Sequence, residues 1–175
     1  MLPIPPYLKL PKVGTAFVGQ GSRRINATFH DERIRHVRLP SEGAHGAIEG
    51  SLDMLYIDGA HRFAPARTDI VEWGARVAPG GTMLIHDSFS SVGVTLAILR
   101  ELVWGGRFRY VGRARSLTEF RADLDSSLGS RALNAATLLL QLPWFVKNLT
   151  IKVLLTLKLG AVVAKVTGRE PEWPY

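Results

Sequence analysis

The stretch that decides the fold is Leu52–His61, LDMLYIDGAH, in which an apolar run ends on a carboxylate, a glycine and an imidazole. A second stretch of the same kind follows at Thr82–Ser88, TMLIHDS, where the apolar run leads into a histidine and an aspartate. Short apolar runs bounded by polar residues predict buried strands, here at Met54–Ile57 and Thr82–Ile85. A helix between them makes a βαβ unit, whose strands are expected to lie parallel with a right-handed crossover.

Further along the chain, the pattern is that of an α/β protein. An apolar stripe at helical spacing predicts a helix between the two strands, and Ala78–Gly81 is predicted to end it with a turn. A second helix is predicted at Val92–Trp104, and two strands close in sequence follow at Phe108–Val111 and Leu117–Phe120. The predicted fold class is therefore α/β: a Rossmann-like, mostly parallel sheet with an antiparallel edge hairpin and a C-terminal helical tail.

The N-terminal third gives weaker signals. Residues 1–12 are rich in proline and are predicted to be irregular, without the basic and apolar regions of a signal peptide. Strands are predicted at Val13–Val18 and Ile34–Leu39, and a short helical turn at Ala44–Ile48. The predicted organisation is an irregular segment at 1–12, an α/β domain at 13–125 and an apolar, basic helical tail at 131–168.

Composition excludes several classes of protein. The 175 residues suit one domain, and the apolar share of 46% is ordinary for a globular protein. The chain has no cysteine, which excludes disulfides and thiolate metal sites and fits a cytoplasmic location. The net charge of +7 comes without a nucleic-acid-binding motif, so no nucleic-acid partner is expected.

The tail differs in kind from the rest of the chain. Ala132–Val146 carries no charge, is interrupted by Pro143, and is shorter than the roughly 20 residues that span a bilayer. Lysines at 147, 158 and 165 fall on one face of a helix, while apolar residues occupy nearly all its other directions. Two interpretations stay open: helices packed on the domain or on a second copy of the chain, and a peripheral helix lying on an anionic membrane.

Charged side chains gather where the two central strands end. In an open parallel sheet, ligands bind outside the carboxyl ends of the strands, and Asp58, His61, His86 and Asp87 all fall there. Neighbouring strand ends are about 5 Å apart, and two carboxylates that close repel unless a cation or a shared proton lies between them. The pair therefore indicates either a divalent metal with oxygen ligands or an aspartate that acts as a general base.

Simpler explanations exist for such residues. An aspartate after a strand often caps the next helix, and a lone histidine often makes only a structural hydrogen bond. Two Asp–His clusters on neighbouring strand ends favour a functional site over a helix cap or a structural hydrogen bond. A serine hydrolase could use Ser88, His61 and Asp58, but no Gly-x-Ser-x-Gly turn surrounds any serine.

The ordered set of motifs resembles a known family. Asp53–His61, then Asp69 and Trp73, Pro79–Gly81 and Leu84–Asp87 resemble the class I S-adenosylmethionine-dependent methyltransferases. Within them the set is most similar to the branch with an IDG-x-H … D-x-x-x-W … PGG … HD pattern, which includes small-molecule and sugar O-methyltransferases. The resemblance covers roughly residues 30–122.

The resemblance implies roles for individual residues. Asp58, His61, His86 and Asp87 match the catalytic side, with either histidine as the candidate base. Asp58 and Asp87 match positions that hold a divalent cation such as Mg²⁺ in metal-dependent relatives, where the metal acidifies the acceptor hydroxyl. The implied cofactor is S-adenosylmethionine, and the implied cofactor-binding residues are Gly19, Gly21, Ser41, Glu42, Asp58 and Gly59.

One part of the family pattern is missing. The family carries a glycine-rich cofactor loop after its first strand and an acidic residue after its second. Gly19-Gln20-Gly21 stands close enough to Asp58 to suit the end of the second strand, with Gln20 in place of the acid. Either the chain is truncated and lacks the first strand, which the spacing favours, or Val13–Val18 takes that place with a shortened loop.

The sequence thus predicts an S-adenosylmethionine-dependent methyltransferase that acts on a hydroxyl of a small molecule or sugar, impaired if truncated. The alternative is a non-catalytic methyltransferase-like module that binds a membrane surface or a partner through its C-terminal helices.

Overall fold

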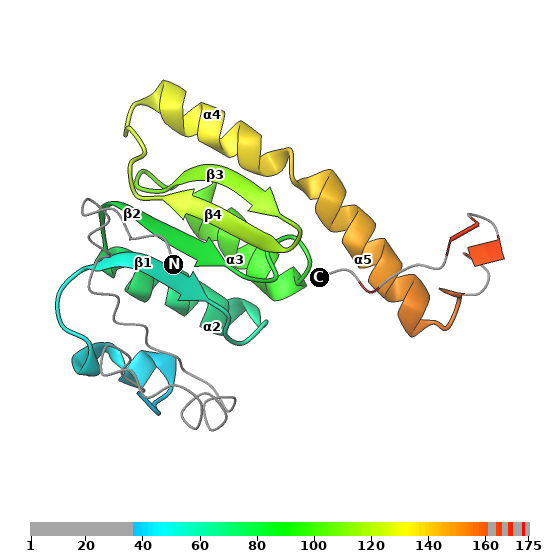
Figure 1. Cartoon of the computed structure of the whole chain (residues 1–175). Coiled ribbons are helices and arrows are strands. Elements are labelled where there is room, and N and C mark those ends of the chain that lie inside the picture. Colours follow the sequence, from blue (N-terminus) through cyan, green and yellow to red (C-terminus); the bar gives the residue numbers. More distant parts are fainter. Residues whose placement is uncertain (1–36, 161–163, 166–167, 170–172, 174–175) are drawn as a thin grey trace, which may run out of the picture.

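The structure is a computed structural model, and it describes residues 37–160, 164–165, 168–169 and 173. The predictions for residues 1–12 and Val13–Val18, and those for Gly19 and Gly21, lie outside these residues. Within them a four-stranded sheet forms the centre, with helices on one of its faces and two consecutive helices beyond its edge (Figure 1).

The sheet has the strand order β1-β2-β4-β3. Strands β1 (Leu52–Ile57) and β2 (Val77–Ile85) are parallel, as predicted, with Met54 opposite Thr82 and Ile57 opposite Ile85. Strands β3 (Arg109–Ala114) and β4 (Leu117–Arg121) form the predicted antiparallel hairpin, and β4 pairs antiparallel with β2. The predicted fold class, a Rossmann-like α/β sheet with an antiparallel edge hairpin and a helical tail, is confirmed; in the described residues the pairings are one parallel and two antiparallel.

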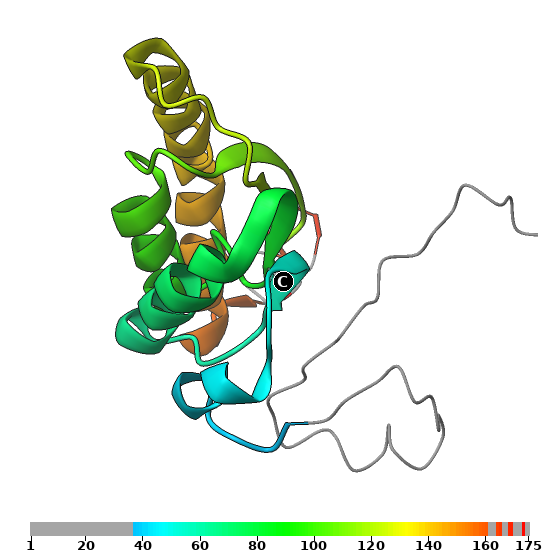
Figure 2. The same cartoon turned by 90° about the vertical axis from the view of Figure 1, so that its left-hand side faces the viewer.

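The two faces of the sheet differ in what covers them. Helices α2 (Phe63–Thr68) and α3 (Val92–Leu102) lie on one face, as the two perpendicular views show (Figures 1 and 2). The side chains that point to this face form the main core, among them Met83, Ile85 and Phe120, each at most 1% exposed. Burying these apolar side chains supplies most of the free energy that stabilises the domain.

The prediction that Met54–Ile57 is a buried strand is wrong for one of its two faces. Met54 is 59% exposed and Tyr56 is 46% exposed, whereas Ile57, which points to the helices, is 8% exposed. Within the described residues β1 is an outer strand, and nothing there covers its second face. The strand therefore alternates, as a strand with one solvated face does.

The segment between β1 and β2 is less regular than the sequence suggests. Helix α2 continues into a π-helical turn at Asp69–Trp73 and a 3-10 turn at Gly74–Arg76. The predicted turn at Ala78–Gly81 is wrong, because these residues belong to β2. They form a bulge in that strand, between Val77, which pairs with Leu52, and Thr82, which pairs with Met54. The strand is held there by hydrogen bonds from Gly80 N to Ala122 O and from Ala122 N to Gly81 O, both 2.9 Å long.

The flanking predictions have mixed outcomes. Helix α3 is confirmed, and the predicted inner residues Val94, Ile98 and Leu102 are all buried. The short turn near Ala44 is confirmed as a 3-10 turn at His45–Ala47, and another 3-10 turn precedes it at Ser41–Gly43. The predicted strand Ile34–Leu39 is not formed over its described part, since residues 37–39 belong to no strand.

The tail forms two helices, α4 (Leu128–Leu139) and α5 (Leu142–Thr156). The Ser127 hydroxyl accepts from Ser130 N and caps α4, while Pro143 lies in the first turn of α5. By length and composition, Leu128–Thr156 is long and apolar enough to cross a membrane, and 11% of its apolar window is buried. This stretch contains the charge-free run Ala132–Val146 and extends beyond it at both ends.

Candidate functional site

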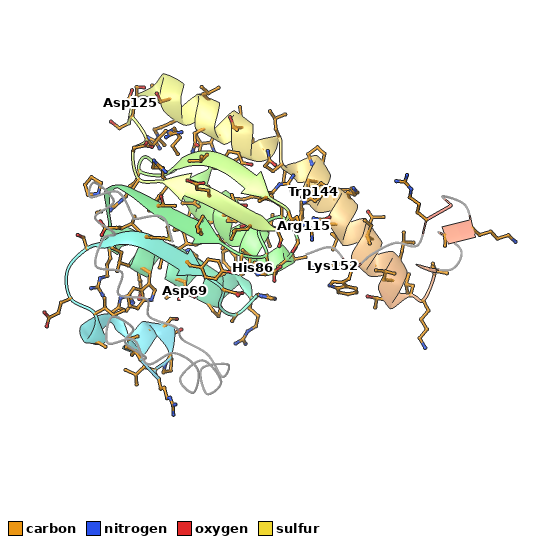
Figure 3. All side chains as sticks on the ribbon, viewed as in Figure 1. Asp69, His86, Arg115, Asp125, Trp144 and Lys152 are labelled. Carbon is orange, nitrogen blue, oxygen red and sulfur yellow. The ribbon has the colours of Figure 1, made fainter. Side chains whose placement is uncertain are left out.

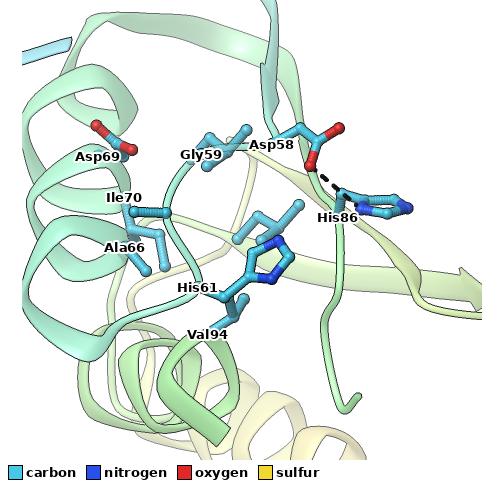
Figure 4. A pocket seen from close by; sticks show the side chains of 11 residues that line it. Asp58, Gly59, His61, Ala66, Asp69, Ile70, His86 and Val94 are labelled. Atoms are coloured by element: carbon cyan, nitrogen blue, oxygen red, sulfur yellow. Dashed lines mark ion pairs between the residues drawn. The ribbon is translucent and has the colours of Figure 1, made fainter. Parts of the chain in front are cut away.

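The carboxyl ends of β1 and β2 bring the four predicted catalytic side chains together. Asp58 and His61 follow β1 directly, and His86 and Asp87 follow β2. Because the strands are parallel and in register, with His86 N donating to Ile57 O at 2.9 Å, both ends open on the same edge of the sheet. Asp58, Gly59, His61 and His86 line a pocket there (Figure 4).

The imidazole of His86 lies between the two carboxylates. Its Nδ1 is 3.3 Å from Asp58 Oδ1 and 3.7 Å from Asp87 Oδ2. On the other side of Asp87, His61 Nε2 is 2.9 Å from the same Oδ2 atom. Carboxylates and imidazoles thus alternate along the row Asp58–His86–Asp87–His61. The imidazole of His86 therefore stands between the two carboxylates.

Asp87 is held in an unusual backbone conformation. Asp87 and Phe89 have φ angles of 54° and 55°, in the left-handed region that side chains other than glycine seldom adopt. Such strain persists only where surrounding contacts impose it. Here Ser88 Oγ donates to Ile85 O at 2.9 Å, Ser88 N donates to Ser116 O at 2.9 Å, and Ser90 Oγ donates to Asp87 Oδ1 at 3.1 Å.

Helix α5 also holds this turn. Asn148 Nδ2 donates to Phe89 O at 2.9 Å, and Lys152 Nζ donates to Ser90 O at 2.7 Å. Asn148 is 1% exposed and Phe89 is fully buried. The turn that carries Asp87 is therefore fixed from three sides: by its own serines, by the β3–β4 hairpin and by α5.

Tyr56 is a site residue that the sequence analysis missed. Its hydroxyl is 3.5 Å from Asp58 Oδ2, and its ring centroid is 6.4 Å from that of His86. Partial burial raises the pKa of the Tyr56 hydroxyl, and the charges of Asp58 and Asp87 add to the effect. The signal was present, because Tyr56 and Asp58 are two residues apart at a strand end and so share one side of the strand.

Asp69 lies on the opposite wall of the pocket, on the π-helical turn. The residue is 7% exposed, and its Oδ1 atom is buried and accepts no hydrogen bond from the residues that the structure describes. Burial raises the pKa of this carboxyl group; the nearby Ser41 hydroxyl acts in the opposite direction. A Cβ atom on Gly59 would lie 2.9 Å from Asp69 Oδ2, so a side chain at this position would displace the Asp69 carboxylate.

The structure places some of the predicted cofactor residues at or near the pocket but gives no support to the predicted metal site. Gly59 borders the pocket, and Ser41 and Glu42 lie on a 3-10 turn close enough to influence Asp69; Gly19 and Gly21 are not among the described residues. The metal prediction for Asp58 and Asp87 gains no support. Over the described ranges, no group of three or more His, Cys, Asp or Glu side chains is arranged to hold a metal ion.

Residues 13–88 match a family model described as a methyltransferase domain. The match ends just past β2, so it includes Asp58, His61, His86 and Asp87, and it supports a methyltransferase domain in this part of the chain. Methyltransferase domains of this kind generally use S-adenosylmethionine. No curated protein sequence matches the chain.

Proposed function

We propose that the protein transfers a methyl group from S-adenosylmethionine to a hydroxyl group of a small molecule or sugar. The observation that carries the proposal is the Asp58–His86–Asp87–His61 arrangement at the strand ends, inside the stretch that matches a methyltransferase domain. An imidazole flanked by carboxylates is suited to taking a proton from a hydroxyl group, which is the one acid–base step this reaction needs.

We assign the general base to His86. Its Nδ1 faces Asp58 and Asp87, which stabilise the imidazolium that forms, and Nε2 remains to accept the proton. His61 holds Asp87 from the other side and acts as a positioning residue in this scheme. The Tyr56 hydroxyl lies beside Asp58 at the same edge of the sheet, where it can donate a hydrogen bond to the acceptor.

When bound, S-adenosylmethionine supplies an electrophilic methyl carbon on a sulfonium centre. The acceptor proton passes to His86 Nε2. Binding the two reactants in line supplies much of the rate, and Gly59, Asp58, Ser41 and Glu42 are the described residues proposed to hold the cofactor.

Variants at the strand ends test the proposed roles. We expect His86→Gln to lower kcat by about 10²- to 10⁴-fold, the usual contribution of a general base. Asp58→Asn should lower kcat less and shift the pH–rate profile, because it removes one of the two charges facing Nδ1. The matched control is Asp53→Asn, an exposed carboxylate on the same strand. The assay measures label transfer from methyl-labelled S-adenosylmethionine to a panel of sugars and phenols.

The competing function is a non-catalytic module. Titration of the full chain with S-adenosylmethionine by calorimetry separates the two. Saturable binding that weakens in Gly59→Val supports the enzyme, whereas no binding at millimolar ligand leaves the non-catalytic module as the function of this chain.

A further inference from the structure

Helix α5 leaves an apolar strip on the molecular surface. Val146, Leu149, Val153 and Leu157 are 37–61% exposed and follow each other at spacings of three and four residues, so they share one side of the helix. Figures 1 and 3 show α5 extending beyond the sheet, away from α2 and α3. Another side of α5 contacts the domain, because Asn148 and Lys152 donate hydrogen bonds to the turn after Asp87.

Basic side chains border this strip. Lys147 and Lys158 are exposed next to it, and neither forms an ion pair within the described residues. Where α5 begins, Arg113 and Lys147 both lie over the ring of Trp144, at 4.2 Å and 4.8 Å from its centroid. The hydrogen bonds of Arg113 go to neutral acceptors, Gln141 Oε1 and Arg115 O.

The sequence around α5 has no negative charge to offset these cations. No aspartate or glutamate occurs from residue 126 to residue 169, a stretch that contains Arg131, Lys147, Lys152, Lys158, Lys165 and Arg169. An exposed apolar strip bordered by Lys147 and Lys158, with Trp144 beside them, is complementary to a surface that is apolar inside and anionic outside. An anionic lipid bilayer has that chemistry.

We propose that α5 docks the protein on an anionic membrane surface. The strip Val146–Leu157 enters the boundary between headgroups and acyl chains, and Lys147 and Lys158 contact lipid phosphates. The helix lies along the surface rather than across it, because a spanning helix would have to give up the contacts of Asn148 and Lys152 with the domain. This inference does not depend on methyl transfer.

The test is flotation of the purified full chain with vesicles of phosphatidylcholine alone or with 30% phosphatidylglycerol. We expect flotation with the anionic vesicles only, reversed by high salt. Lys147→Gln/Lys158→Gln should weaken the partition coefficient by about thirtyfold, since each basic residue near an anionic surface contributes about fivefold. Val153→Gln/Leu157→Gln should weaken it at least as much.

Exposed positions elsewhere provide the matched control. Arg38→Gln/Leu96→Gln removes one charge and one exposed leucine away from α5 and should float like the wild type. The proposal is overturned if the wild type does not float, or if flotation is indifferent to lipid charge. It is equally overturned if Val153→Gln/Leu157→Gln dissociates a dimer without any vesicle binding, or if alkaline carbonate fails to release the protein, which would indicate a spanning helix.

Discussion

Asp69 shows how a single side chain can make stability depend on pH. Its carboxyl group is buried and only partly hydrogen-bonded, and burial disfavours the charged form. The folded protein therefore holds this proton to a higher pH than the unfolded chain does. By linkage, the stability associated with Asp69 is fully present below the ordinary pKa of 3.8 and is lost as the pH rises through the raised value.

We therefore expect Asp69→Asn, which cannot ionise, to lose less stability than the wild type between pH 4 and pH 7. Urea unfolding at each pH gives the midpoint for both proteins. The difference between the two proteins gives the contribution of Asp69 to the pH dependence of stability, because the other titrating groups are the same in both. One of these groups is Asp123, whose pKa is lowered by its hydrogen bond to Arg109. Parallel curves for the two proteins would contradict a raised pKa at Asp69.

At this scale the sequence identified which residues meet but not how they pair. The strand ends predicted that Asp58, His61, His86 and Asp87 converge, because the register of a parallel pair follows from the apolar pattern. That His86 lies between the two carboxylates depends on side-chain rotamers, which a sequence pattern does not specify. The buried position of Asp69 depends on a π-helical turn, which has no recognisable sequence signal here.

Among the elements, strand β2 shows that hydrogen bonding to a distant segment can outweigh the local preference of the sequence. Pro79-Gly80-Gly81 is typical of a turn, yet hydrogen bonds with Ala122 draw it into the sheet as a bulge. Gly80 supports this with a φ of 76°. Helix α3 was predictable because its apolar period is followed by Gly105 and Gly106, shortly after its observed end at Leu102, and no competing pairing changes the outcome.

The contact between α5 and the turn after β2 is testable at one residue. Asn148→Ala leaves the carbonyl of Phe89 buried without a donor, which should lower the free energy of unfolding by about 1–3 kcal/mol. Thr150→Ala, at an exposed position of the same helix, is the control and should change it by less than about 0.5 kcal/mol. Chemical denaturation measures both; equal values would show that the Asn148 bond does not stabilise the turn.

For the whole molecule, the question is whether the tail is a separate unit. The sequence places a boundary between residues 125 and 131, where charged and polar residues give way to an apolar tail. In the structure α4 contributes Ala135 and Leu138 to the main core. Asn134 Oδ1 accepts from Tyr110 N at 2.8 Å, and its Nδ2 donates to Phe108 O at 3.2 Å.

These contacts predict that α4 unfolds together with the sheet. Leu138 is fully buried, so Leu138→Ala should cost about 2–5 kcal/mol and lower the midpoint seen by every probe equally. Leu140→Ala, where the side chain is 75% exposed, should have little effect. Helix signals in the far ultraviolet and tryptophan fluorescence together give the measurement; two separate transitions would mean that the tail folds independently.

The bonds from Asn148 and Lys152 to the carbonyls of Phe89 and Ser90 have a consequence for cooperativity. They join α5 to the strained turn that orients Asp87, so a surface that engages α5 and a ligand at the strand ends act on one structural unit. Thermodynamic reciprocity then applies. If binding to the surface changes the affinity for the ligand by some factor, binding of the ligand changes the affinity for the surface by the same factor. Measuring cofactor affinity with and without vesicles would read this coupling directly.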